Sequence, residues 1–117
     1  MRRENTEKMA IKVAYMQEAL DFLKEIDSSA SKKLTYNIEK VKLGVKDTEV
    51  FKKLTGTNIW EFRTIHCGNC YRLLSFWDTR TNTLIVATHG FVKKSDKTPK
   101  REIDKAEMLR KEYFEDK

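Results

Sequence analysis

The sequence predicts a single α+β domain, in which two N-terminal helices pack on one face of a small antiparallel sheet. The chain has 117 residues, a length typical of one domain with a modest two-layer core. Two stretches with apolar residues at helical spacing precede three stretches that alternate with a period of two, and one more helical stretch follows. The expected order of elements is β-α-α-β-β-β-α.

The N-terminal part of the chain predicts one strand and two helices. Residues 9–15 alternate apolar and polar side chains, which favours a short strand. Apolar residues recur at helical spacing over 16–26 and again over 30–41. Ser28–Ser29 separates the two helices and can cap the second. Gly44 is a natural end to that helix, because glycine adopts the left-handed region at no steric cost.

The strands that follow predict hairpins. Residues 60–63 alternate aromatic and charged side chains, and runs rich in aromatic or β-branched residues follow over 71–77 and 84–91. The connections, 67–69 and 79–82, are short and contain turn residues. Short connections with such residues indicate antiparallel pairing.

The last helix begins near Thr98–Pro99, because threonine can cap a helix and proline fits the first helical position. We expect one domain over residues 1–117, with residues 1–8 flexible. No apolar run approaches the ~20 residues that cross a bilayer, so the sequence predicts a cytoplasmic protein without a membrane partner.

The charge of the chain is concentrated in one segment. The net charge is +6, from 24 Lys and Arg against 18 Asp and Glu, and such a surplus points to a polyanionic partner. Residues 89–101, called the basic segment below, hold five basic side chains against one acidic. They therefore carry +4 of the total. A solvated loop is the alternative interpretation, because most lysine clusters are of that kind.

Two arginines are the main candidates for phosphate binding. Alternation places Glu61 and Arg63 on the face opposite Trp60, away from the two helices. Arg72 lies on the next strand. An arginine pair on neighbouring strands would attract phosphate, since the guanidinium fork adds geometry to charge. A cross-strand ion pair of Arg72 with Glu61 is the structural alternative.

His89, at the end of the last strand, is the candidate acid or base, because an imidazole titrates near neutral pH. A packed strand histidine is the alternative. Cys67 and Cys70 form a lone C-x-x-C, whereas zinc normally needs four ligands and a redox motif would begin a helix. We expect two reduced cysteines, no metal and no cofactor. A zinc-linked or disulfide-linked dimer is the competing hypothesis.

Three stretches of the chain resemble a known family. Residues 51–63 read FKKLTGTNIWEFR, residues 69–72 read NCYR, and residues 89–103 read HGFVKKSDKTPKREI. These stretches resemble the KKL-x-G…WE-[LF]-R and H-G-F-V-K-K…K-T-P-K-R-E-I patterns of a phage-derived family. That family belongs to the RelE/HigB toxins of bacterial toxin–antitoxin systems. The resemblance covers roughly residues 10–114.

The resemblance implies a RelE-like fold and a toxin that inhibits translation. Such a toxin cleaves mRNA on the ribosome without metal, and a helix-turn-helix antitoxin neutralises it. Cleavage by the 2′-OH of the RNA needs stabilisation of negative charge on phosphorus, which fixed cations can supply. Positioning by the ribosome can supply much of the rest. The alternative is a non-catalytic relative that binds RNA, the ribosome or gyrase.

The resemblance also suggests roles for individual residues. We expect the two arginines to contact the scissile or flanking phosphates, and the lysines to guide the backbone or stabilise the leaving oxygen. Phe91 either stacks on a base or packs in the core. The predicted catalytic residues are Arg63, Arg72, His89 and Lys94, and the predicted RNA-binding residues are Phe91, Lys93, Lys97, Lys100 and Arg101.

Overall fold

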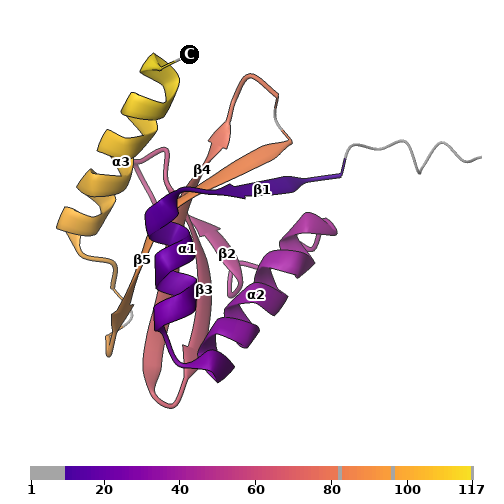
Figure 1. Ribbon diagram of the computed structural model, residues 1–117, viewed down its shortest axis with the longest axis vertical. Helices are drawn as coiled ribbons and strands as arrows, with labels where there is room; N and C mark the ends of the chain where they lie inside the picture. Colours follow the sequence, from indigo (N-terminus) through magenta and orange to yellow (C-terminus); the bar gives the residue numbers. More distant parts are fainter. Residues whose placement is uncertain (1–9, 82, 96, 117) are drawn as a thin grey trace, which may run out of the picture.

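A five-stranded sheet, in the order β1-β5-β4-β3-β2, lies at the centre of the fold (Figure 1). The computed structural model describes residues 10–81, 83–95 and 97–116, so the expected flexibility of residues 1–8 lies outside the described residues. The elements are β1 (Lys12–Tyr15), α1 (Gln17–Glu25), α2 (Ser28–Lys42), β2 (Phe51–Lys53), β3 (Trp60–His66), β4 (Asn69–Asp78), β5 (Leu84–Lys93) and α3 (Lys100–Glu115).

The α+β class is confirmed, but the sheet is mixed rather than antiparallel. β1 pairs in parallel with β5, from Lys12 opposite Leu84 to Tyr15 opposite Ala87. The direction of this pairing could not be predicted from the alternation, because the pattern is the same for parallel and antiparallel strands and no tight turn joins the two. The sequence prediction also missed β2, which has three residues and is too short to show a period.

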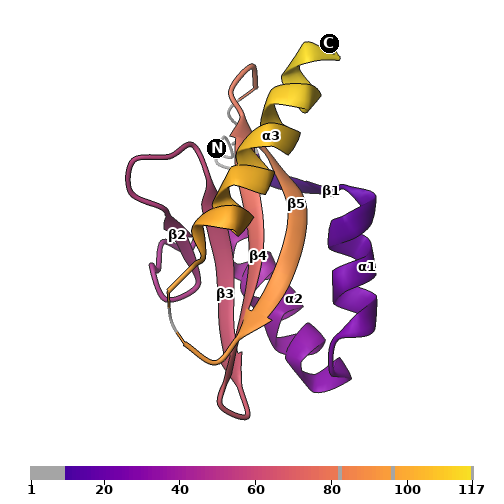
Figure 2. The ribbon, with the colours of Figure 1, turned by 90° about the vertical axis from the view of Figure 1, so that its left-hand side faces the viewer.

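Helices cover both faces of the sheet (Figure 2). The prediction that the two N-terminal helices share one face is confirmed, since Ala19 of α1 and Leu34 of α2 belong to the same buried cluster as Phe62 of the sheet. On the other face, Ala106 of α3 packs with Phe76. Among the described residues, no helix has the length and apolar content needed to cross a membrane.

The helix ends differ in detail from the prediction. Asp27, rather than either serine, caps α2, because its carboxylate accepts hydrogen bonds from the backbone N–H of Ser29 (2.8 Å) and Ala30 (3.2 Å). α3 begins one residue after Pro99, and Thr98 does not cap it. The Thr98 hydroxyl donates instead to Glu61, at 2.8 Å. This bond ties the basic segment to the sheet.

The β3–β4 hairpin fixes the register of the candidate site. Cys67 and Gly68 both have positive φ, 51° and 78°, as a two-residue type I′ turn requires. This turn makes Arg63 and Arg72 direct cross-strand partners. A shift of one residue would move every side chain of a strand to the other face.

Candidate nucleic-acid interface

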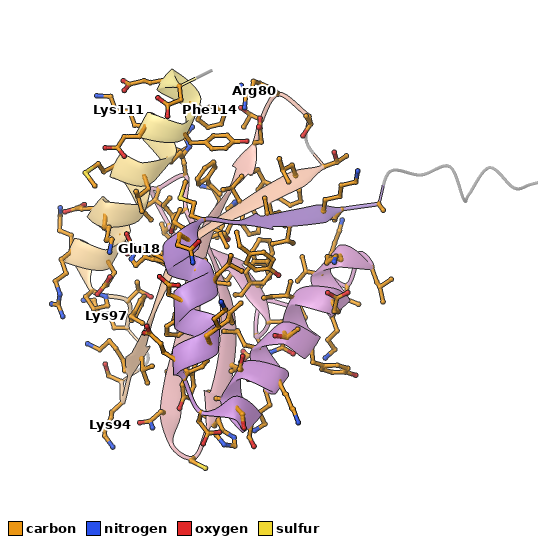
Figure 3. All side chains as sticks on the ribbon, in the orientation of Figure 1. Glu18, Arg80, Lys94, Lys97, Lys111 and Phe114 are labelled. Carbon is orange, nitrogen blue, oxygen red and sulfur yellow. The ribbon has the colours of Figure 1, made fainter. Side chains whose placement is uncertain are left out.

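One groove of about 670 Å³ brings three of the predicted site residues together. Arg63 comes from β3, Arg72 from β4, and Lys94 follows the end of β5. Lys52 of β2 adds a fourth cation, and Glu49 is the carboxylate that lines the same groove. Figure 3 shows Lys94 at the end of β5, far from Lys111 near the end of α3. The charge of the groove suits an anionic ligand.

The sheet register explains why these side chains meet. Direct partners on neighbouring strands place their side chains on the same face, so Arg63 and Arg72 share one face. Lys52 is the direct partner of Glu61, which lies two positions before Arg63 and therefore on that face as well. As predicted, this face is opposite the one that packs on α1 and α2.

Glu61 joins the two arginines below the groove. Its side chain is 3% exposed, and its two carboxylate oxygens lie 3.5 Å from Nε of Arg63 and 3.6 Å from Nε of Arg72. The Arg72–Glu61 ion pair, which the sequence offered as the alternative to phosphate binding, is therefore present. The ion pair and the arginine pair are parts of one cluster, because a single carboxylate contacts both guanidinium groups.

The two arginines differ in accessibility. The Arg72 side chain is 3% exposed, whereas that of Arg63 is 13% exposed. Arg63 also donates from Nη1 to the carbonyl of Thr48, at 3.0 Å. Asn37 of α2 donates to the carbonyl of Arg63, at 2.7 Å, which fastens β3 where β2 no longer pairs with it. Arg63 is thus the better placed of the two to contact a ligand.

His89 lies outside this groove and is 4% exposed. Its Nε2 is 2.9 Å from Oε1 of Glu102, and its Nδ1 is 3.0 Å from Oγ1 of Thr88. Burial lowers the pKa of His89, and the hydrogen bond to Glu102 opposes that shift. Because an ionised carboxylate only accepts, Nε2 donates to Glu102, and the Thr88 hydroxyl itself donates to the carbonyl of Leu74, at 3.2 Å. The structure therefore has the packed strand histidine of the alternative interpretation.

The other predicted residues extend away from the groove. Phe91 is half-buried and packs against the core cluster on the α3 face, although it is the direct partner of Arg72. Lys97 is exposed, and Figure 3 shows it on the same side of the molecule as Lys94. The remaining predicted RNA-binding residues are Lys93, half-buried at the end of β5, and Lys100 and Arg101, exposed in the first turn of α3.

Sequence reasoning missed Lys52 and Glu49 as groove residues. Lys52 lies in β2 and Glu49 lies two residues before it, and without that strand their place beside β3 could not be inferred. The cysteines are both free, with Cys67 exposed and Cys70 buried. Cys70 lines the cationic groove. Within the described part of the chain, no group of three or more His, Cys, Asp or Glu side chains could hold a metal ion.

A second buried carboxylate lies near the other end of α3. Asp78 accepts hydrogen bonds from Nε and Nη2 of Arg80, at 2.9 and 2.6 Å, and from the hydroxyl of Tyr113, at 2.8 Å. The Arg80 hydrogen bonds hold the pKa of Asp78 well below its usual range. The Arg80 guanidinium also lies 5.5 and 5.2 Å from the ring centroids of Tyr113 and Phe114. This cluster fastens the end of α3 to the sheet.

Comparison with known proteins supports the resemblance. Residues 21–111 match the family described as phage derived protein Gp49-like. The free E. coli toxin RelE, solved as a mutant, is similar with a TM-score of 0.59 and 17% identity, over 87% of this chain and 98% of that chain. The toxin–antitoxin complex RelBE2 from Mycobacterium tuberculosis is similar with a TM-score of 0.51 and 17% identity, over 75% of this chain and 97% of that chain. No curated protein sequence matches significantly.

Proposed function

Because the chain belongs to the phage-derived Gp49-like family and has the RelE fold, we propose that it is the toxin of a toxin–antitoxin pair. Its target is mRNA on the translating ribosome, which it cuts as an endoribonuclease in the cytoplasm. One observation supports this activity above the others. Four cationic side chains converge on a single groove of the sheet, with one carboxylate among the residues that line it.

The groove suits the charge that develops during RNA cleavage. When the 2′-OH attacks phosphorus, it loses its proton to water and the new O–P bond forms before the bond to the 5′-oxygen has fully broken, so that negative charge gathers on the phosphate oxygens. The departing 5′-oxygen takes up a proton from water. Arg63 and Arg72 lie on rigid strands, so they stabilise this charge without reorganising. Lys52 and Lys94 are exposed, and they bind the flanking phosphates. The ribosome aligns the 2′-OH with phosphorus.

The rest of the basic segment continues the cationic surface beyond the groove. Lys93, Lys97, Lys100 and Arg101 follow the RNA backbone on either side of the cleaved bond. Phe91 keeps its packing role, since it is half-buried beside α3. Backbone contacts of this kind give an affinity that falls steeply as salt increases.

A second candidate function is RNA or ribosome binding without cleavage. The position of His89 favours it, because that imidazole is buried, bonded at both nitrogens and outside the groove. We therefore place no catalytic role on His89. The two functions differ in one product, which is a cut mRNA.

A translation reaction followed by primer extension separates the two functions. Wild-type protein is expected to produce discrete cuts, and Lys94→Ala and Lys52→Ala to slow their appearance about tenfold each, as removal of one phosphate-binding cation would. Lys111→Ala is the matched control, because Lys111 is an exposed lysine on α3 far from the groove (Figure 3). Intact mRNA on stalled ribosomes would establish the binder instead, and equal effects of all three variants would refute the groove.

We also propose a helix-turn-helix antitoxin as the protein partner. The M. tuberculosis protein with this fold was solved as a toxin–antitoxin complex. If a small helix-turn-helix protein is encoded beside this chain, its co-expression is expected to restore growth and to co-purify with the chain. Growth arrest that persists despite a folded neighbour protein would contradict this partner.

A further inference from the structure

We propose that Glu61 is a positioning residue, which holds Arg63 and Arg72 in the orientation that meets the RNA phosphate. This inference rests on the proposed function of the groove. It concerns a carboxylate that contacts no RNA itself, because Glu61 lies below the arginines and is 2% exposed.

The contacts of Glu61 join three parts of the chain. Oε2 lies 3.5 Å from Nε of Arg63 on the same strand, and Oε1 lies 3.6 Å from Nε of Arg72 on β4. Oε1 also accepts the hydrogen bond from Thr98, at 2.8 Å. A carboxylate removed from water persists only when it is paired and hydrogen-bonded. Here its partners are the two groove arginines and the basic segment.

The negative charge of Glu61 offsets the repulsion between the two arginines of the groove. Arg63 and Arg72 are direct cross-strand partners, and like charges in that position repel each other. The repulsion is poorly screened, because Arg72 is almost fully buried. A negative charge at contact distance from both guanidiniums lets them stay together. Their orientation is then set before the substrate arrives, as efficient charge stabilisation requires.

The Glu61→Gln substitution separates positioning from simple attraction. Glutamine has nearly the same shape and still accepts from Thr98, but the groove gains one unit of positive charge. If the groove acted only by its overall attraction for RNA, this variant would bind RNA more tightly and cleave it faster. If Glu61 positions the arginines, kcat should fall about 10–100-fold, because small misalignments of groups at the reacting centre slow a reaction by about that much. KM should stay the same or fall. A kcat equal to or above that of the wild type would overturn the proposal.

A double-mutant cycle tests whether Glu61 acts through the arginine. If it does, Glu61→Gln combined with Arg72→Gln should lose less activity than the product of the two single losses, because one of the two arginines that Glu61 positions is already absent. Losses that multiply would show that Glu61 acts by another route and would contradict the proposal.

Two further measurements keep the test decisive. Thr98→Val removes one hydrogen bond to Glu61 and keeps every charge, so it probes the cluster even if Glu61→Gln does not fold. An unchanged kcat in Thr98→Val would count against positioning.

The NMR signals of the arginine Nε–H groups report on the arrangement of the arginines without requiring cleavage. Glu61→Gln is expected to shift the signals of Arg63 and Arg72 but not that of Arg80. If wild-type protein cuts no mRNA while these signals behave as expected, the nuclease fails and the arrangement of the arginines stands.

Discussion

Two buried carboxylates on the sheet, Glu61 and Asp78, both bind arginine, and they do so differently. Asp78 and Arg80 form two short hydrogen bonds, at 2.9 and 2.6 Å, between one carboxylate and one guanidinium. Glu61 lies 3.5 and 3.6 Å from two guanidiniums. The Asp78 cluster is locally neutral and compact, which is typical of a structural tie. Among the described residues, the Glu61 cluster has more cations than acids and borders a groove, which is typical of an anion site.

The strongest test of this contrast compares substitutions of the two arginines. Arg63→Ala should lower cleavage by the folded protein about 100-fold, as loss of a fixed cation at the reacting phosphate does, and it should also cost stability, because the buried Glu61 loses one of its partners. Arg80→Ala should lower the free energy of unfolding and leave cleavage by the folded protein unchanged. Primer extension and urea unfolding, performed on both variants, measure the two effects. A loss of cleavage in Arg80→Ala as large as in Arg63→Ala would remove the distinction.

The stability assigned to the Asp78 cluster is the next largest effect. Asp78→Asn should lower the free energy of unfolding by about 2 kcal/mol, because the charge-assisted bonds to Arg80 are weakened. Urea unfolding measures this change, with Lys111→Ala as a surface control. If Asp78→Asn is as stable as the wild type, the cluster does not fasten α3 as inferred.

The pH dependence of stability should distinguish two contacts between α3 and the sheet, that of Tyr113 with Asp78 and that of Glu102 with His89. The pKa of Asp78 is lowered in the fold, so its contribution is present above the ordinary carboxyl pKa of about 4 and is lost as the pH falls below it. The pKa of His89 is also lowered in the fold, so as the pH falls the unfolded chain protonates His89 before the folded protein does. Stability should therefore begin to fall below about pH 6.5.

Thermal unfolding across this pH range measures both steps. His89→Gln should remove the step that begins near pH 6.5 and keep the acidic one, and Asp78→Asn should do the opposite. A wild-type stability that stays flat between pH 7 and 5 would contradict the assignment to His89.

The smallest expected effect concerns the salt dependence of RNA binding. Removing one phosphate-binding cation should reduce the slope of log K against log salt by about 0.7 for single-stranded RNA. Lys94→Ala should therefore flatten the slope, and Lys111→Ala should leave it unchanged. Affinity titrations with a short single-stranded RNA at several salt concentrations measure it. A slope unaffected by Lys94→Ala would exclude phosphate binding by that lysine.

The sequence predicted the parts of the site that depend on local pattern. Alternation in β3 indicated the face of Glu61 and Arg63, and the turn at Cys67–Gly68 implied that Arg72 would lie nearby. Long-range features were out of reach, because nothing in the local pattern encodes which distant element covers a residue. The bond from Thr98 to Glu61 and the burial of His89 against Glu102 both depend on how α3 returns to the sheet. The place of Lys52 in the groove was also out of reach, because β2 has only three residues and forms by pairing with β3.

The parallel pairing of β1 with β5 has a consequence for how the protein is made. β1 leaves the ribosome before its partner β5, because Lys12 pairs with Leu84, 72 positions further along the chain. The sheet therefore closes only after β5 has been synthesised, and the α3 face is covered later still, because α3 follows β5 and extends to Glu115. Folding that depends on such distant contacts is also slow. A chain that has not yet been synthesised as far as Lys94 has no complete groove, because Lys94 is one of the residues that line it.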